Sequence, residues 1–244
     1  MTTDNLPGFK DAGALLSTRE PEPHYIGHRR RLRERFLKVD GDGLLDYELL
    51  ELLLCNAIPR SDVKPLAKHL IDVFGDLPGV ITAPAASLQT IKGAKAGVIY
   101  QFRLMAAISR RMARAEVMKR EVISSWDALM RYCKTAMAHD ATEQFRVLFL
   151  DRKNVLIAEE AQGRGTVDHV PVYPREVAKR ALELNASAII LVHNHPSGDP
   201  TPSEADIVMT RKIVDACGTI GVTIHDHVVI GKERDASFRA LGLL

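Results

Sequence analysis

The sequence contains few cysteines and no long uninterrupted apolar segment. Cys55, Cys133 and Cys217 lie far apart, which argues against a disulfide framework and against a cysteine-rich zinc site. No apolar run approaches the length of a transmembrane helix. The first residues also lack the basic segment and apolar core of a signal peptide. We therefore expect a protein of the reducing cytoplasm, without a membrane partner.

The chain has no large excess of charge of either sign, since its formal net charge is +2. Basic residues nevertheless outnumber acidic ones over residues 1–120, and the balance reverses over 121–244. This asymmetry predicts two parts with different roles. The modest positive charge of the first part permits nucleic-acid binding without requiring it. The length of 244 residues allows one large domain or two small ones.

The first part has the apolar spacing of helices. Apolar residues recur every three or four positions from about residue 25, and the run "DGDG" at 40–43 interrupts them. Further helices are predicted at 61–75, 83–91 and 92–117. We expect a flexible tail at 1–24 and an all-α domain at 25–115.

The second part is rich in β-branched residues from about residue 140. The strands are predicted at 143–151, 154–162, 165–173, 187–193 and 222–231. The helices are predicted at 174–185 and 203–221. This alternation favours an α/β domain at 122–244, with a mixed sheet flanked by helices.

One short run carries most of the chemistry: "HNHPSGDPTPSEAD", residues 193–206. His193 ends a predicted buried strand, and His195 lies two residues on, so both imidazoles can face the same side. The following prolines and glycine prevent a strand or a helix. Ser203 then begins a helix with Asp206 in its first turn, so the chain can return the carboxylate toward both histidines.

Two imidazole nitrogens and one carboxylate leave the fourth corner of a tetrahedral ion open, which is typical of catalytic zinc. Zinc in such a site lowers the pKa of bound water to about 7. A plainer interpretation is that Ser203 and Asp206 only cap a helix. The ordered combination of strand end, His-x-His, proline-rich loop and Ser-x-x-Asp favours the metal site, and capping is compatible with it.

The run resembles the JAMM (MPN+) metalloprotease signature, and its "HNHPSGDP" segment resembles the bacterial RadC branch of that superfamily. Asn194 departs from the Ser or Thr of the commoner JAMM proteases. The resemblance extends to "PREVAKRALELNASAIILV", to "HDHVVIG" and to the helical part, so it covers nearly the whole chain. It implies a mixed-sheet JAMM/MPN-like, deaminase-like α/β domain after a small all-α, helix-hairpin-helix-like domain.

The resemblance also implies roles for individual residues. His193, His195 and Asp206 would bind Zn²⁺, and Ser203 would help to stabilise an oxyanion. Glu143, at the start of the first predicted hairpin, matches the family's general acid/base. The implied activity is that of a zinc metallopeptidase, which cleaves an amide or isopeptide bond in an unidentified peptide or protein.

Other residues offer rival interpretations of the site. Glu143 could be only an exposed strand-end residue, with Glu160 and Glu176 as rival bases. His225 and His227 alternate in a strand and are expected to share one face there, yet they lack the loop and helix that complete the first site. We interpret them as structural or supporting residues.

The sequence assigns no definite chemistry to three more polar side chains. His169 is predicted to lie on the surface of a strand, and Asn194 could face away from the metal and hold the loop backbone. Arg175 is either a surface residue or a binder of a substrate carboxylate or phosphate.

The segment 88–107 resembles a helix-hairpin-helix element, which presents backbone N–H groups to a nucleic-acid phosphate. Its candidate contacts are Lys92, Gly93 and Lys95, although Gly93-Ala94-Lys95 stands where Gly-hydrophobic-Gly is usual. The basic run 28–38 would either contact DNA backbone or form a solvated helix face.

The alternative function is therefore a DNA-associated protein of repair or recombination with a structural or regulatory metal. A protein-docking role for the helical part stays open. Nuclease chemistry at the metal is a third alternative, which the single His-x-His-Asp site makes less favoured.

Overall fold

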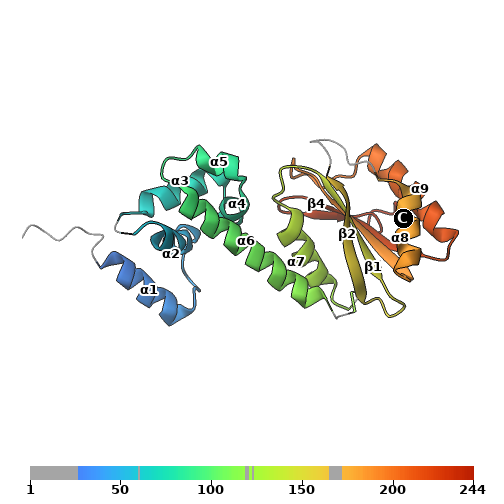
Figure 1. The fold of residues 1–244 in the computed structure, drawn as a ribbon, viewed down its shortest axis with the longest axis horizontal. Coiled ribbons are helices and arrows are strands. Elements are labelled where there is room, and N and C mark those ends of the chain that lie inside the picture. Colours follow the sequence, from blue (N-terminus) through green and yellow to red (C-terminus); the bar gives the residue numbers. More distant parts are fainter. Residues whose placement is uncertain (1–26, 60, 119–120, 123, 165–171) are drawn as a thin grey trace, which may run out of the picture.

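The computed structural model describes residues 27–59, 61–118, 121–122, 124–164 and 172–244 (Figure 1). The predicted tail at 1–24 therefore lies outside the described residues. The helical part contains α1 (His28–Val39), α2 (Asp46–Ala57), α3 (Lys64–Phe74), α4 (Leu77–Thr82), α5 (Ala85–Gln89) and α6 (Ala96–Val117).

The helical part is organised around apolar stripes. Leu50 and Leu54 of α2 are fully buried, as are Leu70 of α3 and Phe102 of α6. Leu50 and Leu54 lie four residues apart, which places them on one face of α2. The stripe predicted from Leu45, Leu49, Leu52 and Leu53 is not that face, since Leu45 is exposed and the other three are only partly buried. The "DGDG" run ends α1 where Asp40 adopts a left-handed backbone conformation with φ 48°.

The second part is an α/β structure with a mixed sheet. Its elements are α7 (Trp126–Met137), β1 (Gln144–Leu150), β2 (Leu156–Arg164), α8 (Pro174–Glu183), β3 (Ala188–Asn194), α9 (Glu204–Gly218), β4 (Thr223–Ile230) and β5 (Asp235–Ser237). The five strands lie in the order β2-β1-β3-β4-β5. Only β3 and β4 pair in parallel, and the other neighbours are antiparallel. The predicted fold class is confirmed.

Helices cover both faces of the sheet. Alternate residues of β3 divide between two clusters, with Ile190 and Val192 on the α7 side and Ile189 and Leu191 on the side of α8 and α9. His193 continues the second series and so reaches the α9 side of the sheet at the end of the strand. The alternation of one buried strand thereby aims the first histidine of the motif toward the helix that carries the aspartate.

Helix α6 links the two parts (Figure 1). Phe102 and Ala106 belong to the helical core, whereas Val117 is fully buried in the sheet-side cluster and Ala113 packs against it. The two parts therefore share one continuous helix.

Several elements differ from the predictions. Helix α7 was not predicted, although Leu129, Cys133 and Met137 have the spacing of a buried helical stripe. The predicted strand at 165–173 falls outside the described residues except at Val172 and Tyr173, which belong to no strand. Within the described residues, the structure contains no helix with the length and apolar character of a membrane span.

Candidate metal centre

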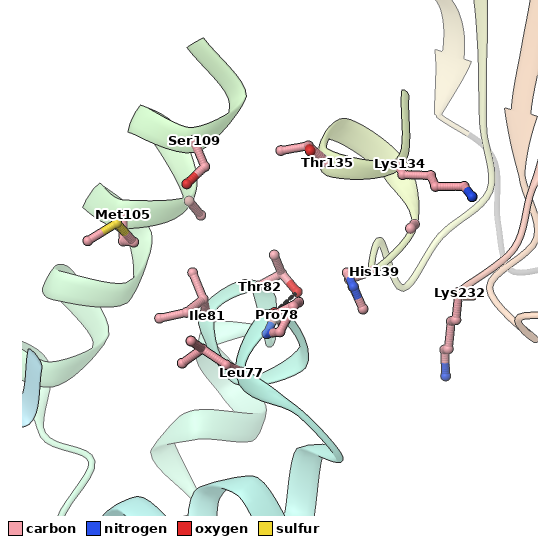
Figure 2. Close-up of a pocket in the computed structure, with 12 residues that line it drawn as sticks. Leu77, Pro78, Ile81, Thr82, Met105, Ser109, Lys134, Thr135, His139 and Lys232 are labelled. Atoms are coloured by element: carbon pink, nitrogen blue, oxygen red, sulfur yellow. Dashed lines mark hydrogen bonds between the residues drawn. The ribbon is translucent and has the colours of Figure 1, made fainter. Parts of the chain in front are cut away.

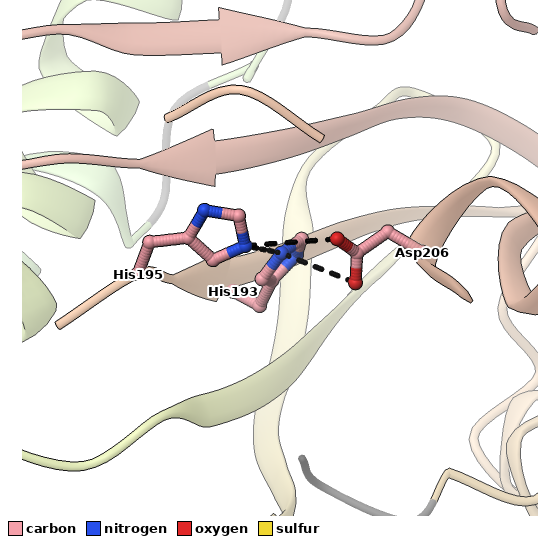
Figure 3. Close-up of side chains that lie close together, drawn as sticks. All are labelled: His193, His195 and Asp206. Carbon is pink, nitrogen blue, oxygen red and sulfur yellow. Dashed lines mark hydrogen bonds and ion pairs between the residues drawn. The ribbon is translucent and has the colours of Figure 1, made fainter. Parts of the chain in front are cut away.

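The ligand atoms of His193, His195 and Asp206 converge on one point (Figure 3). The two Nε2 atoms lie 3.0 Å apart. Nε2 of His193 lies 3.5 Å from Asp206 Oδ1, and Nε2 of His195 lies 3.6 Å from Asp206 Oδ2. The proline-bent loop therefore brings the carboxylate back beside both imidazoles, as the sequence predicts.

The spacing of these atoms fits a bound metal ion. A tetrahedral ion with ligand bonds of about 2.0–2.2 Å places its ligand atoms about 3.3–3.6 Å apart. The two Nε2 atoms lie 3.0 Å apart, and each lies 3.5 or 3.6 Å from a different oxygen of Asp206. One ligand atom from each residue can be chosen so that all three lie within 4.8 Å of one another. Two nitrogens and one oxygen are a donor set that zinc accepts, but iron and manganese accept it too. The geometry supports a metal site without identifying the metal.

The loop after β3 fixes the orientation of the second histidine. The backbone N–H of His195 donates to Ile230 O at 3.0 Å, and Nδ1 of His195 lies 2.8 Å from Asp199 O. A carbonyl oxygen can only accept, so Nδ1 carries the proton and Nε2 presents its lone pair to the metal position. The Asp199 turn thus selects the tautomer of His195 that can bind a metal.

Asp206 is held by the N-terminus of α9. Ser203 is the N-cap, and its Oγ accepts from Asp206 N at 3.2 Å. In return, the Ser203 hydroxyl and backbone N–H both donate to Asp206 Oδ2, at 2.6 and 2.8 Å. The predicted capping role is therefore present. Any donation from Ser203 to an oxyanion requires its hydroxyl to rotate away from Asp206.

The electrostatics of the site favour a charged carboxylate. Burial acts to raise the pKa of Asp206, but hydrogen bonds from His193, His195 and Ser203 outweigh it and hold that pKa well below its usual value. The hydrogen bond with Asp206 raises the pKa of His195, burial opposes this, and the charge of Glu143 adds to the increase. The lowered pKa of Asp206 favours its charged carboxylate beside the two imidazoles.

Asn194, between the two histidines, points away from the metal position. Its Oδ1 accepts from Gln144 N at 2.9 Å, and its Nδ2 donates to Thr142 O at 3.2 Å. These two bonds bracket the backbone of Glu143, immediately before β1. Asn194 is almost fully buried. The structure thus shows that this asparagine ties the Glu143 segment to the metal ligands.

Glu143 is half-buried, and its charge acts on His195. The rival carboxylates lie elsewhere in salt bridges. Glu160 accepts from Arg180 Nη2 at 2.6 Å, and Glu176 accepts from Arg175 Nε at 3.2 Å on the surface. Of the three glutamates, Glu143 is the one whose charge is felt at the metal ligands.

The second histidine pair does not act as a pair. The register of β3 and β4 shifts so that Ile189 lies opposite Ile224 and Ile190 opposite Asp226, which passes over His225. This bulge interrupts the alternation, so the prediction that His225 and His227 share one face is wrong. His225 Nε2 contacts Asn154 Oδ1 at 2.7 Å, whereas His227 Nε2 lies 2.8 Å from His193 Nδ1. His169 lies outside the described residues.

Sequence reasoning missed one polar contributor, Thr210. Its hydroxyl lies 2.6 Å from His227 Nδ1 and donates to Asp206 O at 2.6 Å. Thr210 is almost fully buried, four residues after Asp206 on the same helix face. This four-residue spacing from Asp206 was the feature of the sequence that could have identified Thr210. Burial first, and then His193, hold the pKa of His227 well below its usual value, so this ring is neutral.

The candidate nucleic-acid residues lie far along the chain from the metal ligands, at the start of α6. Gly93 has φ 103° in the turn before this helix, and Lys92 and Lys95 are exposed. A cavity of about 680 Å³ adjoins all three residues and residues 58, 59 and 61–63. The turn is therefore accessible to a ligand.

A separate cavity of about 480 Å³ lies between the helical part and α7 (Figure 2). Ile81 and Met105 line it from α4 and α6, and His139 and Lys232 line it from the sheet part. None of the predicted site residues contributes to its lining. The metal ligands thus lie outside this cavity.

The comparisons with known proteins agree with this geometry. Residues 123–243 match the model of the RadC-like JAB domain. The chain is 64% identical to a UPF0758 protein of Ruegeria pomeroyi over 223 residues, covering 91% of this chain and the whole relative. It belongs to the RadC family. A UPF0758 protein of Rhodobacter capsulatus is 62% identical over 213 residues, covering 87% of this chain and the whole relative. The names of these RadC relatives state no activity.

Proposed function

We propose that this RadC protein is a metal-dependent hydrolase, most specifically a zinc metallopeptidase that cleaves an amide or isopeptide bond. The observation that carries the proposal is the convergence of His193, His195 and Asp206. The charge of Glu143 also contributes to the raised pKa of His195. Two imidazoles and one carboxylate are the protein ligands of many hydrolytic zinc sites, which keep a position open for water or substrate.

A bound divalent ion supplies Lewis-acid polarisation of a carbonyl and makes water easier to deprotonate. The protein residues supply the rest. His193 and His195 would hold the ion through their imidazole nitrogens, and Asp206 would contribute a carboxylate oxygen. Glu143 accepts a proton from the attacking water on its carboxylate and returns it to the leaving amine. The bonds from Asn194 to the backbone of Thr142 and Gln144 fix the chain on both sides of Glu143.

Ser203 has a second role in this proposal. Its hydroxyl donates to Asp206 Oδ2 in the structure. With Asp206 engaged as a metal ligand, the Ser203 hydroxyl would be able to turn and donate to the oxyanion that develops on the substrate carbonyl. The backbone N–H of Ser203 keeps Asp206 in place during this rotation.

The test combines metal analysis with hydrolysis of a library of peptides and isopeptide-linked substrates by the full chain. Wild type is expected to hold one zinc ion and to hydrolyse at least one substrate. Glu143→Gln should keep the metal and lose about 10²–10⁴-fold in rate, as is typical when a general acid/base is removed. His193→Ala should lose both metal and activity.

Glu160→Gln is the matched control, because Glu160 pairs with Arg180 away from the metal ligands. It should hydrolyse the substrate at the wild-type rate. A folded wild type that binds no divalent ion would contradict the proposal. So would Glu143→Gln with undiminished activity.

The turn before α6 supports a second candidate function, contact with DNA. Gly93 has the positive φ that a tight turn between helices needs, and Lys92 and Lys95 are exposed beside it. Lys92→Ala with Lys95→Ala should weaken DNA binding and flatten its salt dependence, because fewer counterions are released. DNA binding with an unchanged salt slope in this double variant would count against these contacts. Binding that survives His195→Ala would show that it is independent of the metal.

A further inference from the structure

Three hydrogen bonds behind the proposed metal position form a continuous circuit that links two of the candidate ligands. His193 Nδ1 lies 2.8 Å from His227 Nε2, and His227 Nδ1 lies 2.6 Å from Thr210 Oγ1. The Thr210 hydroxyl in turn lies 2.6 Å from the backbone oxygen of Asp206. The circuit begins on one ligand, crosses β4 and α9, and ends on the residue that supplies another ligand.

Chemistry permits one order of protons around this circuit when a metal is held by His193 Nε2. That nitrogen must then present its lone pair, so the proton of His193 lies on Nδ1 and is donated to His227 Nε2. His227 must therefore carry its own proton on Nδ1 and donate it to Thr210. The Thr210 hydroxyl is left to donate to the carbonyl of Asp206, which can only accept. Every polar atom in the circuit is satisfied in this order.

Packing holds the two rings of the circuit in place. The His193 ring stacks on Phe145 with an interplanar angle of 13°. The His227 ring stacks on Phe238, with ring centroids 4.4 Å apart. His193 and His227 have 0% exposure, and Thr210 has 1%. Buried polar groups are costly unless they are paired, so a fully paired circuit at this position has a defined orientation.

We propose that His227 and Thr210 are positioning residues, which fix the metal-binding tautomer of His193 and couple its orientation to Asp206. The inference rests on the metal site of the proposed function. It goes further by assigning a role to two residues that do not reach the metal position themselves. Neither residue is expected to touch the substrate.

The test measures Zn²⁺ and Co²⁺ affinity of the full, metal-stripped chain by competition with a chromophoric chelator. His227→Phe keeps a ring for stacking but removes the acceptor for His193 and the donor for Thr210. Thr210→Val keeps the side-chain shape and removes only the hydroxyl. Each variant should bind metal about 10–100-fold more weakly, as is typical when the partner of a ligating histidine is lost. The absorption spectrum of bound Co²⁺ should also change, because the ligand orientation is released.

Two further variants separate positioning from general packing. Thr210→Ser restores a hydroxyl and should recover most of the wild-type affinity and the Co²⁺ spectrum. His225→Phe is the matched control on the same strand, because His225 contacts Asn154 and not a ligand. It should bind metal as the wild type does. If His227→Phe fails to fold, the comparison of Thr210→Val with Thr210→Ser still decides the question.

The proton order gives an independent readout. In the metal-bound chain with ¹⁵N-labelled histidine, the nitrogen shifts of His193 and His227 should both report a proton on Nδ1. Detection of His227 with its proton on Nε2 would overturn the inference. So would Thr210→Val with wild-type affinity and spectrum, or Thr210→Ser with the same loss as Thr210→Val. These failures differ from failure of the proposed function, in which folded wild type itself binds no metal.

Discussion

Two histidine pairs with the same spacing lie on neighbouring parallel strands, and they behave differently. His193 and His195 stand where β3 ends, and their Nε2 atoms converge with Asp206. His225 and His227 lie within β4, and a bulge separates their surroundings. The first pair meets Asp206 because the chain leaves the sheet after β3 and returns at α9, whereas a bulge in β4 separates the two histidines of the second pair.

The difference shows that His-x-His spacing alone does not make a metal site. A strand end frees the second imidazole from strict alternation, and the Asp199 carbonyl then selects its tautomer. Within β4, only His227 reaches the centre, where it supports His193 from behind. The position of the pair in the strand therefore decides which histidines can become ligands.

The largest expected effect comes from breaking the first pair. His195→Ala should lose stoichiometric metal binding, whereas His225→Ala should keep it, as measured by metal analysis of the purified chains. A ligand at 100 times its Kd stabilises the folded state by about 2.7 kcal/mol. For a chain of this size, each kcal/mol of added stability raises the Tm by roughly 2–4 °C. Added metal should raise the Tm of His225→Ala and leave that of His195→Ala unchanged.

The opposite ranking of these two variants would undo the comparison. Equal loss of metal from both would mean that β4 contributes a ligand after all. Metal retained by His195→Ala would mean that the convergence seen at the end of β3 does not bind the ion.

Most of the elements, and the convergence of His193, His195 and Asp206, could be predicted from the sequence because they follow from local rules. That these three residues bind a metal stays a prediction. Strand alternation directs His193 toward α9, and the prolines force the return that brings Asp206 back. The different surroundings of His225 and His227 were not predictable, because a bulge in β4 depends on how that strand pairs with β3. Thr210 was missed for a similar reason, since its role exists only once α9 lies against β4. Helix α7 was missed although its own apolar spacing was visible.

Removal of the Phe238 ring tests whether stacking on His227 holds that histidine in its orientation. Phe238→Ala deletes a fully buried side chain that stacks on His227. Such a truncation typically lowers the free energy of unfolding by about 3–5 kcal/mol. It should also weaken metal affinity, because His227 loses its support. Chemical denaturation and metal competition measure the two effects separately, and a large loss of stability with unchanged metal affinity would show that the stacking does not orient His227.

The two histidine pairs also differ in the residue that lies between the histidines, which is Asn194 in the first pair. Asn194→Ala leaves the buried Gln144 N–H without its acceptor and removes the part-buried hydrogen bond to Thr142 O. We expect the free energy of unfolding to fall by about 1–3 kcal/mol. Metal affinity should change little, because the ligands stay in place, while hydrolysis should fall as the Glu143 segment loosens. A variant that loses metal and activity in equal measure would show that Asn194 acts on the ligands.

The smallest effect on stability is expected at His225, which contacts Asn154 and no candidate metal ligand. Burial first, and then the charge of Arg239, lower the pKa of His225 below its usual value, so the folded chain keeps this ring neutral. The unfolded chain binds a proton there at a higher pH, near the ordinary histidine pKa of about 6.5. Its contribution to stability is therefore present above that pH and lost as the pH falls through the folded pKa. In metal-free protein, the free energy of unfolding should thus decline less steeply on acidification in His225→Ala than in wild type. An identical decline in both chains would remove His225 from the acid response and leave the hydrogen bond to Asn154 as its only role in β4.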